Sequence, residues 1–173
     1  MSDEQRPADH ERGTEHDSVS RTMTASPEAV FAVLVDPTRH KELDAVRMIQ
    51  EPLTTDELTH EGQVFRVAMA RRLGGGERQD YVVDNHVIVF EPPHRIGWAP
   101  ALDGGEPFGW TWVFDIESAP AGCEVTQTYD WSGTDPEVRE SIPFPAIPRE
   151  YREKTLERLE QAALGHPGSG LSG

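Results

Sequence analysis

The chain has 173 residues, a length that suits one domain of ordinary size. Its 16 lysine and arginine residues are outnumbered by 31 aspartate and glutamate residues, so the formal net charge is −15. Such an acidic chain lacks the basic surface that binds phosphate groups, which argues against nucleic acids and anionic membranes as partners.

Cysteine content and apolar segments exclude further classes. The single cysteine, Cys123, excludes an internal disulfide, and no cluster of cysteine and histidine has the spacing of a zinc site. We therefore expect neither a metal nor another cofactor. Residues 1–17 contain no apolar segment typical of a secretory signal, and no run of about 18 apolar residues predicts a membrane-spanning helix. The expectation is a cytoplasmic protein without stable membrane insertion.

The two ends of the chain differ from its centre. Residues 1–17 are rich in acidic side chains and have no large aliphatic residue after Met1, so they cannot offset the entropy of ordering and should be disordered. Residues 165–173 are rich in glycine, serine and proline, which predicts a flexible tail. One folded domain should span residues 18–164.

The domain should begin with a strand and a helix. Apolar and polar residues alternate over 19–24, which predicts a strand. The Ser-Pro-Glu sequence at 26–28 is a typical helix start, because serine caps the first turn and proline fits the first helical position. The helix should end at the Asp-Pro pair 36–37, since a residue before proline avoids the helical conformation. A second, short helical turn is expected within 38–46.

From residue 47 to 131 the apolar pattern has a period of two, which is typical of strands. The glycine run 74–76 lacks the following lysine and serine or threonine of a phosphate-binding loop, so it predicts a hairpin turn. Successive strands with short turns predict an antiparallel meander. Its clearest strand segments are 65–70, 81–90, 95–99, 110–116 and 125–131.

A long amphipathic helix should close the domain. Residues 149–164 contain no glycine or proline, and their apolar residues recur at helical spacing. Such a helix must bury its apolar stripe, and the concave side of a curved sheet is the obvious surface. The predicted fold class is therefore α+β, with a sheet of six or seven antiparallel strands wrapped around the C-terminal helix.

This order of elements, together with several motifs, resembles a known family. The motifs are Ala-Ser-Pro-Glu-Ala-Val-Phe at 25–31, Val-Asp-Pro-Thr-Arg-His at 35–40, Gly-Trp-Thr-Trp-Val at 109–113, Gly-Cys-Glu-Val-Thr-Gln-Thr-Tyr-Asp-Trp at 122–131 and the terminal helix. Over residues 18–164 the chain resembles the START-like, helix-grip superfamily of SRPBCC proteins. The resemblance is closest to its bacterial polyketide cyclase/dehydrase and lipid-transport branch.

The resemblance implies a helix-grip fold with a deep cavity between sheet and helix, which binds apolar or amphipathic small molecules. It does not imply one reaction, because members include lipid carriers, hormone receptors, aromatic cyclases and proteins with no known ligand. Aromatic residues on neighbouring strands suit such a cavity, and they suit ordinary core packing equally well. The predicted ligand-binding residues are Phe65, Val67, Met69, Asn85, Val87, Trp98, Trp112, Phe114, Tyr129 and Leu159.

Polar residues on the strands have two interpretations. Asn85 shares a strand face with apolar residues, so its amide should orient a ligand carbonyl or hydroxyl, or bond to the protein or solvent. Gln127 and Tyr129 have the same ambiguity. Arg66 and His86 are expected on the solvent side.

His40 and Asp44 are the candidates for acid/base catalysis, with Tyr129 as a third. On one helical turn, the spacing of four residues would place the imidazole beside the carboxylate, which raises the imidazole pKa and orients its tautomer. The same spacing is common on solvated surfaces. Metal ligation is not predicted, because no third ligand converges on the pair.

Three functions remain open. The leading hypothesis is a monomer or homodimer that binds a small hydrophobic or amphipathic molecule, such as a lipid, a polyketide or an aromatic compound. An alternative is a polyketide cyclase/dehydratase-like enzyme acting in the same cavity. A second alternative is a protein-interaction module without a ligand. An acid/base pair aimed into the cavity would favour the enzyme. A mostly apolar cavity would favour the carrier, and a cavity filled by side chains would favour the interaction module.

Overall fold

The computed structural model describes residues 15–72 and 76–165. Seven strands form one sheet in the order β1-β7-β6-β5-β4-β3-β2, and every neighbouring pair is antiparallel. The elements are β1 (His16–Met23), α2 (Pro27–Leu34), η1 (Pro37–Arg39), α3 (His40–Leu43), β2 (Ile49–Pro52), β3 (Val64–Arg72), β4 (Arg78–Glu91), β5 (Arg95–Leu102), β6 (Thr111–Ala119), β7 (Gly122–Asp130), α4 (Pro136–Ser141) and α5 (Arg149–Ala163).

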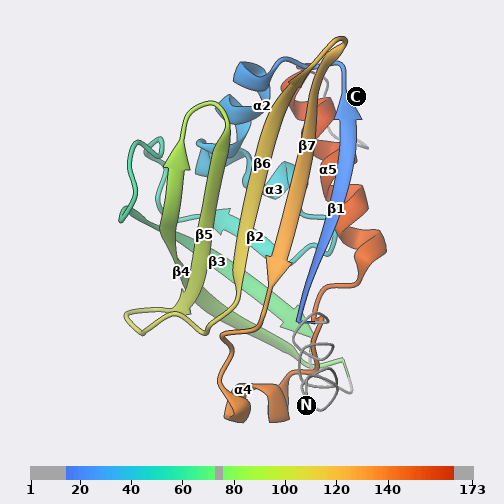
Figure 1. Cartoon of the computed structure of the whole chain (residues 1–173). Helices are drawn as coiled ribbons and strands as arrows, with labels where there is room; N and C mark the ends of the chain where they lie inside the picture. Colours follow the sequence, from blue (N-terminus) through green and yellow to red (C-terminus); the bar gives the residue numbers. More distant parts are fainter. Residues whose placement is uncertain (1–14, 73–75, 166–173) are drawn as a thin grey trace, which may run out of the picture.

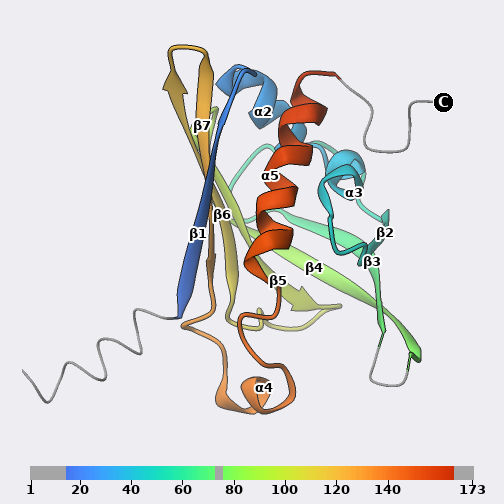
Figure 2. The same cartoon turned by 90° about the vertical axis from the view of Figure 1, so that its right-hand side faces the viewer.

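The sheet curves around α5 (Figure 1). From the side, α5 crosses the hollow of the sheet, with β1 on one flank and α3 with β2 on the other (Figure 2). The predicted α+β helix-grip fold is confirmed, with the C-terminal helix where the apolar periodicity placed it.

Capping side chains determine where the helices after β1 begin. Ser26 accepts a hydrogen bond from the backbone N–H of Ala29 at 3.1 Å, and Pro27 occupies the first helical position of α2. Asp36 in turn accepts a hydrogen bond from the N–H of Thr38 at 3.0 Å, which starts η1. These caps satisfy backbone donors that a helix start leaves unpaired, so the chain turns twice within a short distance.

The first strand begins before residue 18. His16 pairs with Asp130 and Asp17 with Tyr129, so both belong to β1 although their composition placed them in the acidic tail. Pairing with β7 supplies hydrogen bonds that local composition does not reveal. The rest of the predicted N-terminal tail (1–14), the tail 166–173 and the glycines at 74 and 75 lie outside the described residues.

The hydrophobic core lies between the sheet, α2 and one side of α5. Leu156 and Leu159 of α5 are fully buried, and so is Cys123 of β7. The N-terminal part of α5 differs, because Tyr151 is 43% exposed and lines a cavity instead of the core.

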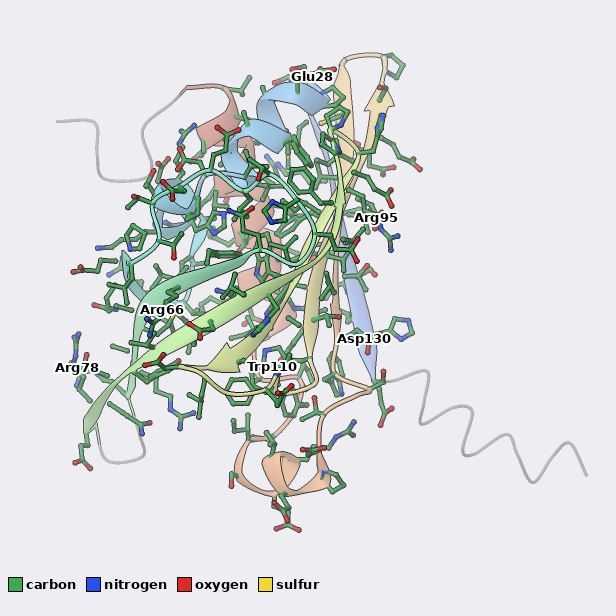
Figure 3. All side chains as sticks on the ribbon, turned by 90° about the vertical axis from the view of Figure 1, so that its left-hand side faces the viewer. Glu28, Arg66, Arg78, Arg95, Trp110 and Asp130 are labelled. Carbon is green, nitrogen blue, oxygen red and sulfur yellow. The ribbon has the colours of Figure 1, made fainter. Side chains whose placement is uncertain are left out.

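The outer face of the sheet carries charged side chains. Arg66, Arg78 and Arg95 point away from the molecule (Figure 3), and Arg66 pairs there with Asp84 at 3.0 Å. His86, also expected on the solvent side, is half-buried. None of the helices in the described ranges is long and apolar enough to cross a membrane.

Candidate ligand-binding cavity

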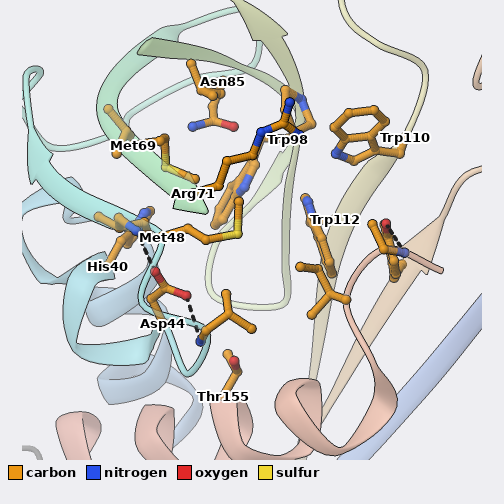
Figure 4. A pocket seen from close by; sticks show the side chains of 18 of the residues that line it. His40, Asp44, Met48, Met69, Arg71, Asn85, Trp98, Trp110, Trp112 and Thr155 are labelled. Carbon is orange, nitrogen blue, oxygen red and sulfur yellow. Dashed lines mark hydrogen bonds between the residues drawn. The ribbon is translucent and has the colours of Figure 1, made fainter. Parts of the chain in front are cut away.

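A cavity of about 450 Å³ lies between the concave face of the sheet and α5. Strands β2 to β7, the turn after α3, the segment that follows α4 and the start of α5 all contribute to its walls. Trp98, Trp110 and Trp112 face this space, and Asn85 and Thr155 lie on opposite sides of it (Figure 4). The walls are mainly carbon, with a few polar groups set among aromatic and aliphatic side chains.

Most of the residues that the sequence selected lie on this wall. They are Phe65, Val67, Met69, Asn85, Trp98, Trp112, Phe114 and Tyr129. Val87 and Leu159 do not line the cavity and are buried in the hydrophobic core. Only the first two turns of α5 reach the cavity, so Leu159 points into packed core further along the helix. A bulge between Val87 and Val89 interrupts the pairing of β4 with β5 next to Val87.

Other wall residues were not selected from the sequence. Tyr81 and Val83 share the face of Asn85 on β4, so strand alternation could have found them. Ile142 and Ile147 come from a proline-rich stretch without periodicity, and no sequence signal pointed to them. Arg152 and Thr155 also line the cavity, but they lie on a helix whose apolar face was expected to pack entirely in the core.

Aromatic contacts hold the wall in place. Trp112 stacks on Tyr129 with ring centroids 4.0 Å apart and an interplanar angle of 5°. Trp98 stacks on His40 at 5.2 Å and meets the edge of Phe65 at 5.3 Å. Because each ring already packs against another, the wall is largely preorganised, and a ligand orders few side chains on binding.

His40 is a buried, neutral imidazole. Its Nε2 lies 2.8 Å from the carbonyl oxygen of Leu34, so this nitrogen donates and Nδ1 is left as an acceptor in the neutral form. Burial lowers the pKa of His40, and the hydrogen bond to Leu34 and the charge of Asp36 oppose this effect only in part.

The predicted pairing of His40 with Asp44 does not form. Helix α3 ends at Leu43, and Asp44 has the extended angles φ −81° and ψ 97°, so the two side chains are not stacked on one helical turn. The carboxylate of Asp44 instead accepts hydrogen bonds from the backbone N–H groups of Val46 at 3.2 Å and Ile49 at 2.6 Å. Its role is to fix the turn between α3 and β2.

Tyr129, the third catalytic candidate, is fully buried on the wall. Its hydroxyl oxygen accepts a hydrogen bond from the N–H of Ala146 at 3.3 Å. Burial raises the pKa of Tyr129 to about 12, against the smaller opposing effects of that hydrogen bond and of Arg152. The phenol therefore stays protonated at neutral pH.

Arg152 lines the cavity with its charge already neutralised. The guanidinium is 2% exposed and donates to the carboxylate of Asp17 at 2.7 Å and to the carbonyl of Ile147 at 3.2 Å. It also lies over the ring of Tyr129 at 5.5 Å. An ion pair of this kind ties α5 to β1 and leaves little charge for a ligand.

Two buried amide side chains stand on the wall. Asn85 is 7% exposed and Gln127 is 5% exposed, and both line the cavity. Within the described part of the chain, the buried Oε1 of Gln127 has no hydrogen-bond partner. Across residues 15–72 and 76–165, no group of three or more His, Cys, Asp or Glu side chains could hold a metal ion.

Residues 16–163 match the model of the family described as polyketide cyclase / dehydrase and lipid transport. The chain belongs to this family. The match spans nearly all of the described residues, and the fold is that of the START-like SRPBCC superfamily to which the family belongs.

Individual relatives are more distant. An uncharacterized protein of Mycobacterium tuberculosis is 29% identical over 116 residues, which are 65% of this chain and 47% of that protein. This chain therefore spans about half the length of that relative.

Solved structures share the fold at low identity. A protein of Mycobacterium smegmatis has a TM-score of 0.63 at 13% identity, covering 89% of this chain and 94% of its own. A protein of Rhodobacter sphaeroides has a TM-score of 0.60 at 18% identity, covering 87% and 93%. An AHSA1-like protein of Aeromonas hydrophila has a TM-score of 0.55 at 17% identity, covering 87% and 94%.

Proposed function

We propose that the protein binds a small hydrophobic or amphipathic molecule in the cavity between the sheet and α5. The observation that carries this proposal is the cavity itself, about 450 Å³ in volume, with mainly apolar walls. Family membership supports the same function, because the family description includes lipid transport.

The apolar walls offer enough energy for such binding. At about 25 cal/mol per Å², a ligand that loses about 300 Å² of apolar surface gains roughly 7 kcal/mol before the costs of association are subtracted. A single polar anchor adds only about 1 kcal/mol. Affinity should therefore follow the walls, with the polar groups deciding orientation.

The other two functions have less support. A cyclase- or dehydratase-like reaction needs a positioned acid or base, but Asp44 is engaged by backbone N–H groups and His40 donates to Leu34. The neutral ring of His40 would favour the enzyme, because its Nδ1 can accept a proton. A module that only recruits proteins would have no use for an open interior space of this size.

Calorimetric titration with naphthalene, an apolar probe that fits the cavity, tests the proposal. Trp112→Ala removes a large ring from the wall and should weaken binding by about 1–3 kcal/mol, roughly 5- to 150-fold in Kd. Phe90→Ala is the matched control, because this ring packs on Phe31 at 5.6 Å and is not among the lining residues. It should change the Kd less than twofold.

The same titration separates carrier from enzyme. His40→Gln and Asp44→Asn should leave naphthalene affinity within about threefold, since each keeps the approximate size of a side chain that supplies little apolar surface. Turnover of a co-purified molecule by the parent protein, lost in His40→Gln while binding is retained, would support the enzyme and contradict the carrier.

A further inference from the structure

We infer that the cavity selects an uncharged molecule bearing a hydroxyl or carbonyl group, which the amide of Gln127 or that of Asn85 holds. The inference rests on the proposed function, because it names the chemical class of ligand for the same cavity. It depends on a buried amide oxygen of Gln127 without a partner, on a second buried amide at Asn85, and on the state of the charged groups around them.

Gln127 gives the first reason. It stands on β7 between the buried Val125 and Tyr129, and its side chain is 95% shielded on the wall of the cavity. Its Oε1 has no partner among the described residues. A buried polar group left unpaired costs about 1–3 kcal/mol, so a ligand group that completes its hydrogen bonds recovers part of this cost.

Asn85 gives a second anchor at another place. It stands on β4, and β5 and β6 separate it from Gln127 on β7. Three strand spacings correspond to about 14 Å along the sheet, so one small polar group cannot bond to both amides. Trp98 and Trp112, a cross-strand pair on β5 and β6, lie between them and would contact the apolar body of the ligand.

The titratable groups of the inner wall disfavour an anionic ligand. Arg152 is already paired with Asp17 at 2.7 Å, and the imidazole of His40 is neutral and bonded to Leu34. Asp44 adds a negative charge to the same wall. A carboxylate taken into the interior beside these three groups would lose its hydration without gaining a counter-charge from them, which costs several kcal/mol.

Arg71 does not change this conclusion. Arg71 also lines the cavity, at the exposed end of β3, where it donates to Oε1 of Gln79 at 2.9 Å and lies over the ring of Tyr81 at 5.8 Å. An ion pair at such an exposed position contributes about 0.2–1 kcal/mol, which is less than the desolvation cost inside. The amides, as neutral donors and acceptors, match hydroxyl and carbonyl groups instead.

Three probes of one shape test the inference on the full chain at neutral pH. Naphthalene measures the apolar wall alone, naphthol adds a hydroxyl group and naphthoate adds a carboxylate. We expect naphthol to bind about fivefold more tightly than naphthalene, and naphthoate at least tenfold more weakly than naphthol. Naphthoate binding as tightly as naphthol overturns the inference and leaves the proposed function standing. If neither naphthalene nor naphthol binds, both are overturned.

Substitutions assign the anchors. Gln127→Met and Asn85→Leu keep the approximate shape but remove the amides, so the double variant should lose about fivefold or more in naphthol affinity and less than twofold in naphthalene affinity. Thr155→Val is the matched control, because the Thr155 hydroxyl lines the cavity but already donates to the carbonyl of Tyr151 at 3.1 Å. Unchanged naphthol affinity in the double variant overturns the assignment.

The thermal stability of the ligand-free protein tests the role of Gln127 independently. Replacing a buried, unpaired amide by an apolar side chain of similar shape removes a desolvation cost, so Gln127→Met should raise the Tm of the free protein. A lowered Tm would mean that Gln127 is bonded within the protein and is not waiting for a ligand.

Discussion

Arg152 shows how a single buried charge is accommodated beside an apolar cavity. Its partner Asp17 lies on β1, and Asp17 also accepts hydrogen bonds from Arg149 at 2.7 and 2.9 Å. The pair joins the first strand to the start of the last helix, residues far apart in the sequence. Local pattern did not reveal it, because Asp17 reads as part of an acidic tail and Arg152 as a surface residue of an amphipathic helix.

Removing Asp17 should therefore be costly. Asp17→Ala leaves a guanidinium that is 2% exposed without its counter-charge, and we expect a loss of about 2–3 kcal/mol in unfolding free energy. Asp115→Ala is the control, since its pair with Arg95 at 3.0 Å is exposed on both sides and should cost less than about 1 kcal/mol. Equal losses in urea denaturation would contradict this role for Asp17.

The carboxylates that join β1 to α5 also predict an acid-sensitive fold. Burial raises the pKa of Asp17, but hydrogen bonds and charges from Arg152 and Arg149 outweigh it, so the pKa lies below its ordinary 3.8. Glu160 behaves likewise: burial raises its pKa, while the N–H of Thr24 and the side chain of Arg21 bring it below 4.5.

Proton binding determines the direction in which stability changes with pH. As the pH falls, the unfolded chain takes up these protons first, so the stability present above the ordinary values is lost as pH falls through the lowered pKa values. The urea midpoint should drop between about pH 5 and pH 3 in the parent protein, and less steeply in Glu160→Gln. A midpoint that rises over this range would have the opposite sign to the one expected.

At the scale of elements, α5 has two parts with different tasks. Its first turns line the cavity, and its later turns bury Leu156 and Leu159 in the core. Leu159→Ala should cost about 2–5 kcal/mol in unfolding free energy, because the side chain is fully buried in packed surroundings. Glu157→Ala, which breaks only an exposed 3.5 Å pair with Lys154, should stay within about 0.5 kcal/mol. A cost well below 1 kcal/mol for Leu159→Ala in the same denaturation experiment would show loose docking of the helix.

Strand β5 must approach β6 closely to place the aromatic wall. A Cβ on Gly97 would lie 2.7 Å from the carbonyl oxygen of Trp112 and 2.8 Å from Cγ2 of Val113. Gly97→Ala should therefore displace β6, lower the unfolding free energy by about 1–3 kcal/mol and weaken naphthalene binding. Gly105→Ala is the control, because its Cβ would have no contact shorter than 3.4 Å. Parent-like stability and affinity in Gly97→Ala would contradict this packing.

The sequence predicted those helices and strands whose pattern of residues is local. Alternation found the long strands, and the absence of glycine and proline marked α5. Strand β2 (Ile49–Pro52) and helix α4 (Pro136–Ser141) were missed, because one is a short edge strand and the other starts in a proline-rich segment. The His40–Asp44 pairing failed for a similar reason: the end of α3 depends on the backbone of Ile49, which lies beyond the helix.

At the scale of the whole molecule, the sequence predicted the layers and the family resemblance implied a cavity between them, but neither decided which apolar residues line it. Trp98 and Trp112 were expected on a wall, and they are, yet Val87 and Leu159 have equally apolar neighbours and lie in the core. Whether an apolar side chain faces a cavity or packed atoms depends on sheet curvature and on where α5 crosses, and neither is encoded by residue type. The partnerless amide of Gln127 was likewise visible only in three dimensions.

The central claim is that an apolar molecule occupies the space between the sheet and α5. A crystal structure of the protein with saturating naphthol tests it most directly. The account predicts one ring system inside the cavity in contact with Trp112, with its hydroxyl group bonded to Gln127 or Asn85. Naphthol found only on the outer surface, with the interior space closed by protein side chains, would contradict it.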